Sequence, residues 1–208
     1  MNSKFKRLLM ALLGVIMTSI SIAIFQRASL GTDPFTSFIT GICNIFGISF
    51  GVFYSIICAC VLIFVFIVDK SYIGIATIFN LLGSGFIVDI ARGYLVVLVP
   101  NQTYIVRISL LIIAVVLMCF SASLYFTANL GVSAYDAISI IMSDKKIASF
   151  KKCRITTDSI CVIVGFTLKA SIGIGTIITA LFMGPLIQWF NTHISEPLLY
   201  DKEFSYFF

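Results

Sequence analysis

Residues 21–35 read SIAIFQRASLGTDPF, and residues 121–135 read SASLYFTANLGVSAY. The two stretches share a serine, an alanine and a Leu-Gly pair at a spacing of 100 residues. A second pair follows in register, IGIAT at residues 73–77 and IGIGT at residues 172–176. Self-similarity at a fixed period is the signature of a duplicated unit. The chain is therefore predicted to consist of two related halves.

The composition is that of an integral membrane protein. Of the 208 residues, 60% are hydrophobic and 11% are charged, and the mean hydropathy is +1.09. About a quarter of the residues of a soluble domain are charged. We therefore expect an all-α protein whose main partner is the lipid bilayer.

The net charge of +5 comes largely from two basic clusters, Lys4–Arg7 and Lys145–Arg154. Such clusters are typical of cytoplasmic membrane flanks, which predicts a cytoplasmic N-terminus. No basic patch alternates with stacking aromatic residues, so no nucleic-acid partner is expected.

The six cysteines do not predict a metal or disulfide site. The chain has one histidine and no C-x-x-C motif, and most of the cysteines lie in apolar runs, where cysteine behaves as a small hydrophobe. No nucleotide-binding loop or nucleophile-base motif is present. We expect no metal, no cofactor and no enzymatic activity.

The run from Pro34 to Val68 contains 35 residues without a charge. As one helix it would be about 53 Å long, whereas the hydrocarbon core of a bilayer is about 30 Å thick. The glycines of residues 47–51 predict a break. The run then divides into a short helix near 34–46 and a spanning helix near 51–68.

The same plan predicts about six transmembrane helices and two short half-helices in one membrane domain. The first half covers about residues 8–92, with its last helix at 72–91. A connector follows at 93–103. The second half covers about 104–190, with helices at 104–128, 134–143, up to about 168, and 172–190. Residues 191–208 are predicted to form an interfacial tail.

Whether the short helices cross the membrane decides the symmetry. If they do not cross, each half has three crossings and the two halves form an inverted repeat. If they cross, the repeat is parallel. With the N-terminus inside, the inverted arrangement places ten basic residues inside and the parallel one places eleven, so charge does not distinguish them. The short second half-helix favours the inverted arrangement.

Two helix starts could bind a ligand. Thr32-Asp33-Pro34 combines N-cap residues with a proline at the first helical position. Its counterpart is Ser133-Ala134-Tyr135-Asp136, which has the capping-box spacing. In the functional interpretation, both helix N-termini point into the membrane interior and bind an anionic group near Asp33 and Asp136. In the alternative, Asp136 only caps its own helix.

Arg154 and Asp158 are the second candidate site. Only ten uncharged residues separate Asp158 from Lys169, too few to span a bilayer, so the helix must begin earlier. The two charges are four residues apart on one helix face. Charge inside a membrane is costly unless paired, and it marks functional sites. A purely structural ion pair is the alternative.

These motifs resemble the YczE/YyaS/YitT-like bacterial membrane proteins. The resemblance rests on Leu-Gly-x-x-Pro after the first helix, on Arg154 and Asp158, and on IGIGT followed by Met183-Gly184-Pro185. It covers about residues 10–190 and implies a multi-pass protein of the bacterial cytoplasmic membrane. It implies no substrate. The sequence departs from the pattern at Ala134, where the first copy has proline, and at Asp158, where a glutamate is expected.

Two hypotheses for the function follow. The first is a transporter of a small molecule or ion, with Asp33, Asp136, Arg154 and Asp158 in a substrate-binding site between the halves. The ligand would be small and anionic or otherwise ionic. The second is a non-transporting membrane partner or regulatory protein, which would contact a protein partner or a second copy through Lys145–Arg154 and its glycine faces.

Overall fold

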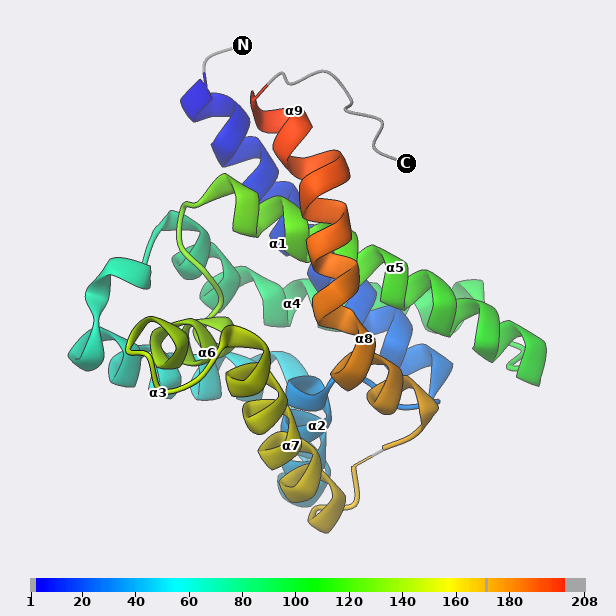
Figure 1. Cartoon of the computed structure of the whole chain (residues 1–208). Coiled ribbons are helices and arrows are strands. Elements are labelled where there is room, and N and C mark those ends of the chain that lie inside the picture. The colour runs from blue at the N-terminus through cyan, green and yellow to red at the C-terminus, as the bar shows by residue number, and fades with distance from the viewer. Residues whose placement is uncertain (1–2, 171, 201–208) are drawn as a thin grey trace.

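The structure is a computed structural model that describes residues 3–170 and 172–200. Within these ranges every regular element is a helix (Figure 1). The helices are α1 (Ser3–Ala28), α2 (Pro34–Phe46), α3 (Phe50–Val68), α4 (Ile75–Leu98), α5 (Tyr104–Ala128), α6 (Ala134–Asp144), α7 (Phe150–Thr167), α8 (Ile174–Phe190) and α9 (Glu196–Tyr200), with the short segments η1 (Lys70–Tyr72) and η2 (Asn191–Ser195). The predicted all-α class is confirmed.

Five helical segments of the described ranges are long and apolar enough to cross a membrane. They are Lys4–Ala28, Phe50–Val68, Ile75–Leu98, Tyr104–Ala128 and Ile174–Tyr200. The sixth predicted span corresponds to α7, which is 18 residues long and contains Lys152, Arg154 and Asp158. The count of six crossings therefore stays a prediction.

The two short helices lie where the sequence places them, because their ends are locally encoded. The Asp33 carboxylate accepts a hydrogen bond from the backbone N–H of Thr36 at 3.1 Å, and α2 ends at Gly47, whose φ of 65° is left-handed. In α6 the hydroxyl of Ser133 accepts from the N–H of Asp136 at 3.1 Å. Side-chain N-caps and a left-handed C-terminal glycine are the usual limits of a helix.

Helices α1 and α5, which occupy corresponding places in the two halves, cross each other in antiparallel directions. Early residues of α1 contact late residues of α5, and the reverse holds at the other end. Small residues permit the close approach. The hydroxyls of Thr18 and Ser121 are 2.8 Å apart, and Ser21 donates to the carbonyl of Ala114 at 2.7 Å.

Each of these two helices has its last carbonyl bound by an arginine of the other. Arg7 of α1 donates to the carbonyl of Ala128 at 3.1 Å, and Arg107 of α5 donates to the carbonyl of Ala28 at 2.8 Å. Both the arginines and the alanines are 100 positions apart in the chain. A cation at a helix C-terminus satisfies free carbonyls and interacts favourably with the helix dipole.

The two repeated motifs also contact each other across the halves. The carbonyl of Leu130 accepts from the N–H of Ala76 at 3.0 Å, and the carbonyl of Leu30 accepts from the N–H of Gly175 at 2.9 Å. Glycine is required at these contacts, since a Cβ on Gly74 would lie 2.0 Å from the Leu130 carbonyl oxygen. Gly131 has a φ of 105°, a conformation that glycine adopts without strain.

Two predicted boundaries differ from the structure. Helix α4 continues past Arg92 to Leu98, so the first six residues of the expected connector 93–103 are helical. Residues 191–200 of the expected interfacial tail continue α8 as η2 and α9, and residues 201–208 lie outside the described ranges. Long-range contacts explain the extension, because Ser195 shares a hydrogen bond with Ser123 at 2.7 Å and Tyr200 accepts one from Arg7 at 3.3 Å. The division into halves stays a prediction.

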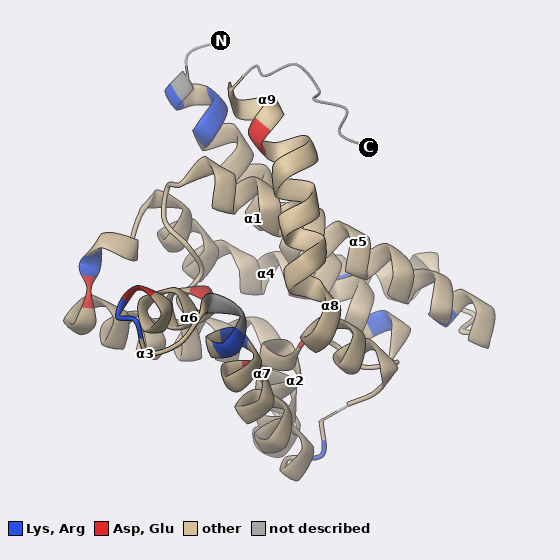
Figure 2. Ribbon diagram, in the orientation of Figure 1, with Lys and Arg blue, Asp and Glu red and all other residues tan. Residues whose placement is uncertain are grey.

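Charged residues collect at helix ends and in loops, with long uncharged helical stretches between them (Figure 2). Arg27 donates to the carbonyls of Val99 and Pro100, which places it beside the α4–α5 connection. The turn that contains Lys70 lies at the opposite ends of α4 and α5, where Tyr72 donates to Asp144 of α6. This hydrogen bond raises the pKa of Tyr72 to about 12. Arg7, which binds the last carbonyl of α5, lies at this second pole. Below we call the first pole the Arg27 end and the second pole the Arg7 end.

The glycine contact generates a first prediction. Gly74→Ala should lower the free energy of unfolding by about 1–3 kcal/mol, because the added methyl group forces the backbone of Leu130 to move. Thermal unfolding of the purified protein in detergent measures the change. The control is Gly93→Ala in the same helix, where a Cβ meets nothing within 4 Å. That control should be neutral or stabilising by roughly 0.5–1 kcal/mol, and equal effects of the two substitutions would contradict the proposed contact.

Candidate functional site

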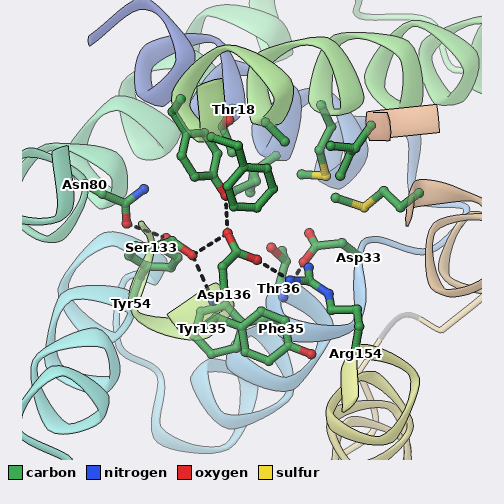
Figure 3. Close-up of a pocket in the computed structure, with 17 residues that line it drawn as sticks. Thr18, Asp33, Phe35, Thr36, Tyr54, Asn80, Ser133, Tyr135, Asp136 and Arg154 are labelled. Carbon is green, nitrogen blue, oxygen red and sulfur yellow. Dashed lines mark hydrogen bonds and ion pairs between the residues drawn. The ribbon is translucent and has the colours of Figure 1, made fainter. Parts of the chain in front are cut away.

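A small cavity lined by both polar and apolar side chains lies between the two predicted halves of the chain (Figure 3). Its volume is about 60 Å³. A cavity needs roughly 10–15 Å³ of this kind of volume to hold one water molecule. The cavity is therefore large enough for several waters or a small ion.

The residues that line this cavity come in pairs from corresponding positions. Members of each pair are 100 residues apart: Thr18 and Met118, Ile22 and Ala122, Asp33 and Ser133, Phe35 and Tyr135, Thr36 and Asp136, Tyr54 and Arg154. Helices α1 and α5 contribute the first two pairs, and the starts of α2 and α6 contribute the next three. The cavity thus lies where the same elements of both halves meet.

One guanidinium links two carboxylates beside the cavity. Arg154 forms an ion pair with Asp136, and its Nε lies 3.4 Å from Oδ1 of Asp158. Both aspartates are buried, with 5% and 4% of their surface exposed. Removing one member of a buried ion pair leaves an uncompensated charge, so the three side chains depend on each other.

Tyrosine hydroxyls complete the polar contacts of these carboxylates. Tyr125 donates to Asp136, and Tyr135 donates to Asp158. The hydroxyl of Ser133 also donates to Asp136, at 2.7 Å. Hydrogen bonds to an ionised group are stronger than those between neutral groups.

The aromatic ring of Tyr135 is enclosed on its faces. The guanidinium carbon of Arg154 lies 4.7 Å from the centre of the Tyr135 ring, and the ring of Phe35 is stacked on Tyr135 with centroids 4.6 Å apart. Cation–π contact and stacking hold the guanidinium in a fixed orientation. Residues of α2, α6 and α7 are thereby joined in one layer.

Asp33 is placed differently from the other two carboxylates. Its Oδ1 accepts the helix-capping hydrogen bond from Thr36, but its Oδ2 is buried and has no hydrogen-bond partner among the described residues. The hydroxyl of Thr36 is also buried without a partner, and Thr36 is only 1% exposed. Figure 3 shows Asp33 and Thr36 side by side, facing Asp136 and Arg154.

The structure brings the four predicted site residues together. Asp33, Asp136 and Arg154 line the cavity, and Asp158 contacts Arg154 directly behind it. The capping alternative for Asp136 does not describe its carboxylate, since Ser133 caps the helix and the Asp136 oxygens accept from Arg154, Tyr125 and Ser133. Substrate binding by these four residues stays a prediction.

A second cavity, which we call the vestibule, opens at the Arg27 end. Its volume is about 550 Å³. Its lining includes Thr32, Thr40, Asn44, Asp89 and Arg92. Thr36 lines the central cavity, and Thr40, one helical turn further along α2, lines the vestibule. The two cavities therefore lie along the same face of α2.

Metal binding by the usual ligand sets has no support in the described residues. No group of three or more histidine, cysteine, aspartate or glutamate side chains in those ranges is arranged to hold a metal ion. The six cysteines are free.

Comparison with known proteins identifies the family. The model of a family of unknown function, DUF6198, matches residues 5–192. The chain belongs to this family. No solved structure matches the chain.

Relatives of the chain are found in two bacteria. An uncharacterised protein of Haemophilus influenzae is 22% identical over 94% of this chain and 88% of its own length. In Bacillus subtilis, the uncharacterised membrane protein YczE is 23% identical over 85% of this chain and 81% of its own, and the uncharacterised protein YyaS is 24% identical over 93% and 96%. The resemblance to YczE and YyaS inferred from the motifs is confirmed, and the match to YczE agrees with a membrane protein.

Sequence reasoning missed the tyrosines of the site, although the repeat contained a signal for them. Tyr125 and Tyr135 stand where the first half has Phe25 and Phe35. The second half therefore adds hydroxyl groups near the positions where it also adds carboxylates. Two aligned Phe-to-Tyr differences beside a predicted charge pair indicate hydrogen-bond donors.

The ion cluster generates a second prediction. Arg154→Met should destabilise the protein by roughly 3–5 kcal/mol, because Asp136 and Asp158 would remain buried without a counter-charge. Adding Asp136→Asn and Asp158→Asn to this variant should recover part of the loss. The control is Lys152→Met, an exposed charge on the same helix. Thermal unfolding in detergent measures all variants, and equal stability of the Arg154 and Lys152 variants would contradict the cluster.

Proposed function

We propose that the protein is a membrane transporter for a small molecule or ion, with its substrate site in the central cavity. The observation that supports this most is the position of the cavity. The cavity lies between corresponding residues of two similar halves, with the charged residues Asp33, Asp136 and Arg154 in its lining. Transporters built from internal repeats bind their substrates and coupling ions at the interface between the repeats.

We further propose that the two halves form an inverted repeat. The antiparallel crossing of α1 and α5 supports it, because corresponding helices of a parallel repeat would run in the same direction. Arg27 and the Lys70 turn lie at opposite poles of the molecule. This position supports the inverted arrangement, because the parallel one would require both residues on the same side of the membrane. Reciprocal contacts, such as Arg7 with Ala128 and Arg107 with Ala28, are expected of two related units that exchange partners.

The short helices α2 and α6 also fit this function. Both begin at the central cavity, at Asp33 and Ser133, and neither is long enough to span a bilayer core of about 30 Å. Transporters use such discontinuous helices to place backbone dipoles and polar caps at the binding site. The charged residues at this depth favour a functional role, because unneeded charge inside a membrane is costly.

The proposed setting is the bacterial cytoplasmic membrane, with a cytoplasmic N-terminus. The basic residues Lys4, Lys6 and Arg7 support this orientation, and so does the position of Lys145 and Lys146 at the same pole. The vestibule at the Arg27 end would then open to the outside.

The partner hypothesis has less support from the packing. Gly74 and Gly131 contact each other, and a Cβ on Gly85 would meet the backbone of Gly51, so these glycines pack within the chain. Lys145, Lys146 and Lys152 are exposed and remain available to a partner. A protein partner, a homo-oligomer and the absence of enzymatic activity all stay predictions.

Transport can be tested in proteoliposomes with the full chain. A panel of small charged solutes is screened first for thermal stabilisation of the protein and then for uptake. Asp158→Asn should abolish both effects, because it removes one of the two carboxylates that orient Arg154. Asp69→Asn, which changes a carboxylate in the Lys70 turn away from the central cavity, should retain them. The absence of both binding and uptake across a broad panel would count against a transporter.

The inverted arrangement predicts a labelling pattern. Single cysteines are placed at Ser71 and Thr103 in a cysteine-free background of the full chain. Both positions are exposed and lie at opposite poles. A membrane-impermeant thiol reagent should label Ser71→Cys from the cytoplasmic side and Thr103→Cys from the outside. Labelling of both positions from one side would contradict this topology, and the reverse pattern would support a parallel repeat.

A further inference from the structure

The charges of the central site do not balance. Three carboxylates, those of Asp33, Asp136 and Asp158, surround the single guanidinium of Arg154. Arg154 is already paired with two of them. With all three carboxylates ionised, the site would carry a net charge of about −2, which is costly in a membrane interior. The oxygen that has no positively charged or hydrogen-bonding partner among the described residues is Oδ2 of Asp33.

The atoms around Asp33 also lack partners. Oδ2 of Asp33 and Oγ1 of Thr36 are both buried without a hydrogen bond among the described residues. Thr36 is 1% exposed and lines the central cavity. Buried polar atoms in proteins are nearly always satisfied by protein, water or a bound ion. Even when the Thr36 hydroxyl donates to the Asp33 carboxylate, lone pairs of both groups remain free for a ligand that accepts electron pairs from oxygen.

An anion does not suit these atoms. A carboxylate repels an anion, and the guanidinium that could attract one is already shared between Asp136 and Asp158. A carboxylate and a hydroxyl oxygen, with one or two waters, are instead ligands for a hard cation. The cavity volume of about 60 Å³ fits a small ion with a few waters.

We propose that Asp33 and Thr36 bind a small alkali cation that enters from the vestibule. Only the role of the cation, as the cargo or the coupling ion, rests on the proposed transport function. The binding site itself follows from the unpaired oxygens.

The route from the vestibule follows one face of α2. Thr40 lies one turn beyond Thr36, lines the vestibule, and has a buried hydroxyl without a partner. The sequence Asp33, Thr36, Thr40 thus offers three oxygens between the central cavity and the vestibule. The corresponding positions of α6 are Ser133, Asp136 and Ile140, so the second half presents an apolar side chain where the first presents Thr40.

Binding is measured first by thermal unfolding of the purified full chain in detergent. Sodium, potassium and choline chlorides are compared at equal concentration and pH. An alkali ion that binds only the folded site should raise the melting temperature above the choline value in a concentration-dependent way. Asp33→Asn should abolish this shift while it preserves the helix cap, because asparagine is also a good N-cap residue. Asp69→Asn serves as the charge-matched control.

A pH series in choline buffer measures how far protonation of Asp33, in place of a bound alkali ion, neutralises the site. Uptake of a proton by the folded site should raise the melting temperature as the pH falls, and Asp33→Asn should remove this part of the pH dependence. Other ionisable groups that face Asp33 contribute to the same curve, so only the difference between parent and variant is used. These groups are Arg154, Asp158, Asp136, Tyr54, Tyr125 and Cys161.

Thr36→Val provides a second test if Asp33→Asn fails to fold. It should weaken the alkali-ion shift, whereas Thr156→Val at an exposed position of α7 should leave it unchanged. An alkali-dependent shift that requires Asp33 supports the site. The absence of an alkali-dependent shift, or its persistence in Asp33→Asn, would overturn it. A cation-dependent shift without uptake of any solute would refute the transport function alone, and uptake that is unaffected by Asp33→Asn would refute the cation site alone.

Discussion

The pairing of one arginine with two buried aspartates constrains much of the second half of this protein. Arg154 can lie in an apolar surrounding only if Asp136 and Asp158 remain beside it. This requirement fixes the start of α6 against α7. The hydroxyl of Tyr125 then links α5 to Asp136, and the hydroxyl of Tyr135 adds a second contact between α6 and α7 through Asp158. The ring of Phe35 on Tyr135 then ties α2 to the same cluster. Through these contacts the ion cluster joins four helices, namely α2, α5, α6 and α7.

A second constraint is the close approach of backbones between the halves. The Leu-Gly turn of each half rests on the glycine-rich helix start of the other, and the arginines at positions 7 and 107 bind each other's helix ends. None of these contacts can form within one half. Because these contacts join residues 1–98 to residues 104–200, the two parts of the chain depend on each other, and the central cavity lies between them. The two constraints thus meet at the same place.

The parts of this structure that depend on local chemistry could be predicted from the sequence. The limits of α2 follow from Asp33, Pro34 and Gly47, and the spacing of Arg154 and Asp158 indicates that they share a helix face. Features that depend on distant contacts could not be predicted in this way. Residues 191–200 look like a polar tail, and they are helical because Ser195 and Tyr200 bind residues of α5 and α1. The ion pair between Arg154 and Asp136 joins two different helices, so no local pattern predicts it. The repeat indicates only that the two helix starts converge.

The differences between the halves are more informative than their similarity. At the cavity the first half has Thr36 and Tyr54 where the second half has Asp136 and Arg154, and beside it Cys58 corresponds to Asp158. The second half therefore contains an ion cluster whose own charges are largely satisfied. The first half contributes Asp33, an acid that caps its helix with one oxygen and leaves the other without a partner. In a rocking motion of the halves, the distance between Asp33 and Arg154 would change, while the contacts of Arg154 with Asp158 would not, since both lie on α7. A positive charge bound at Asp33 would then favour one arrangement of the halves over the other, which is the property that couples ion binding to movement.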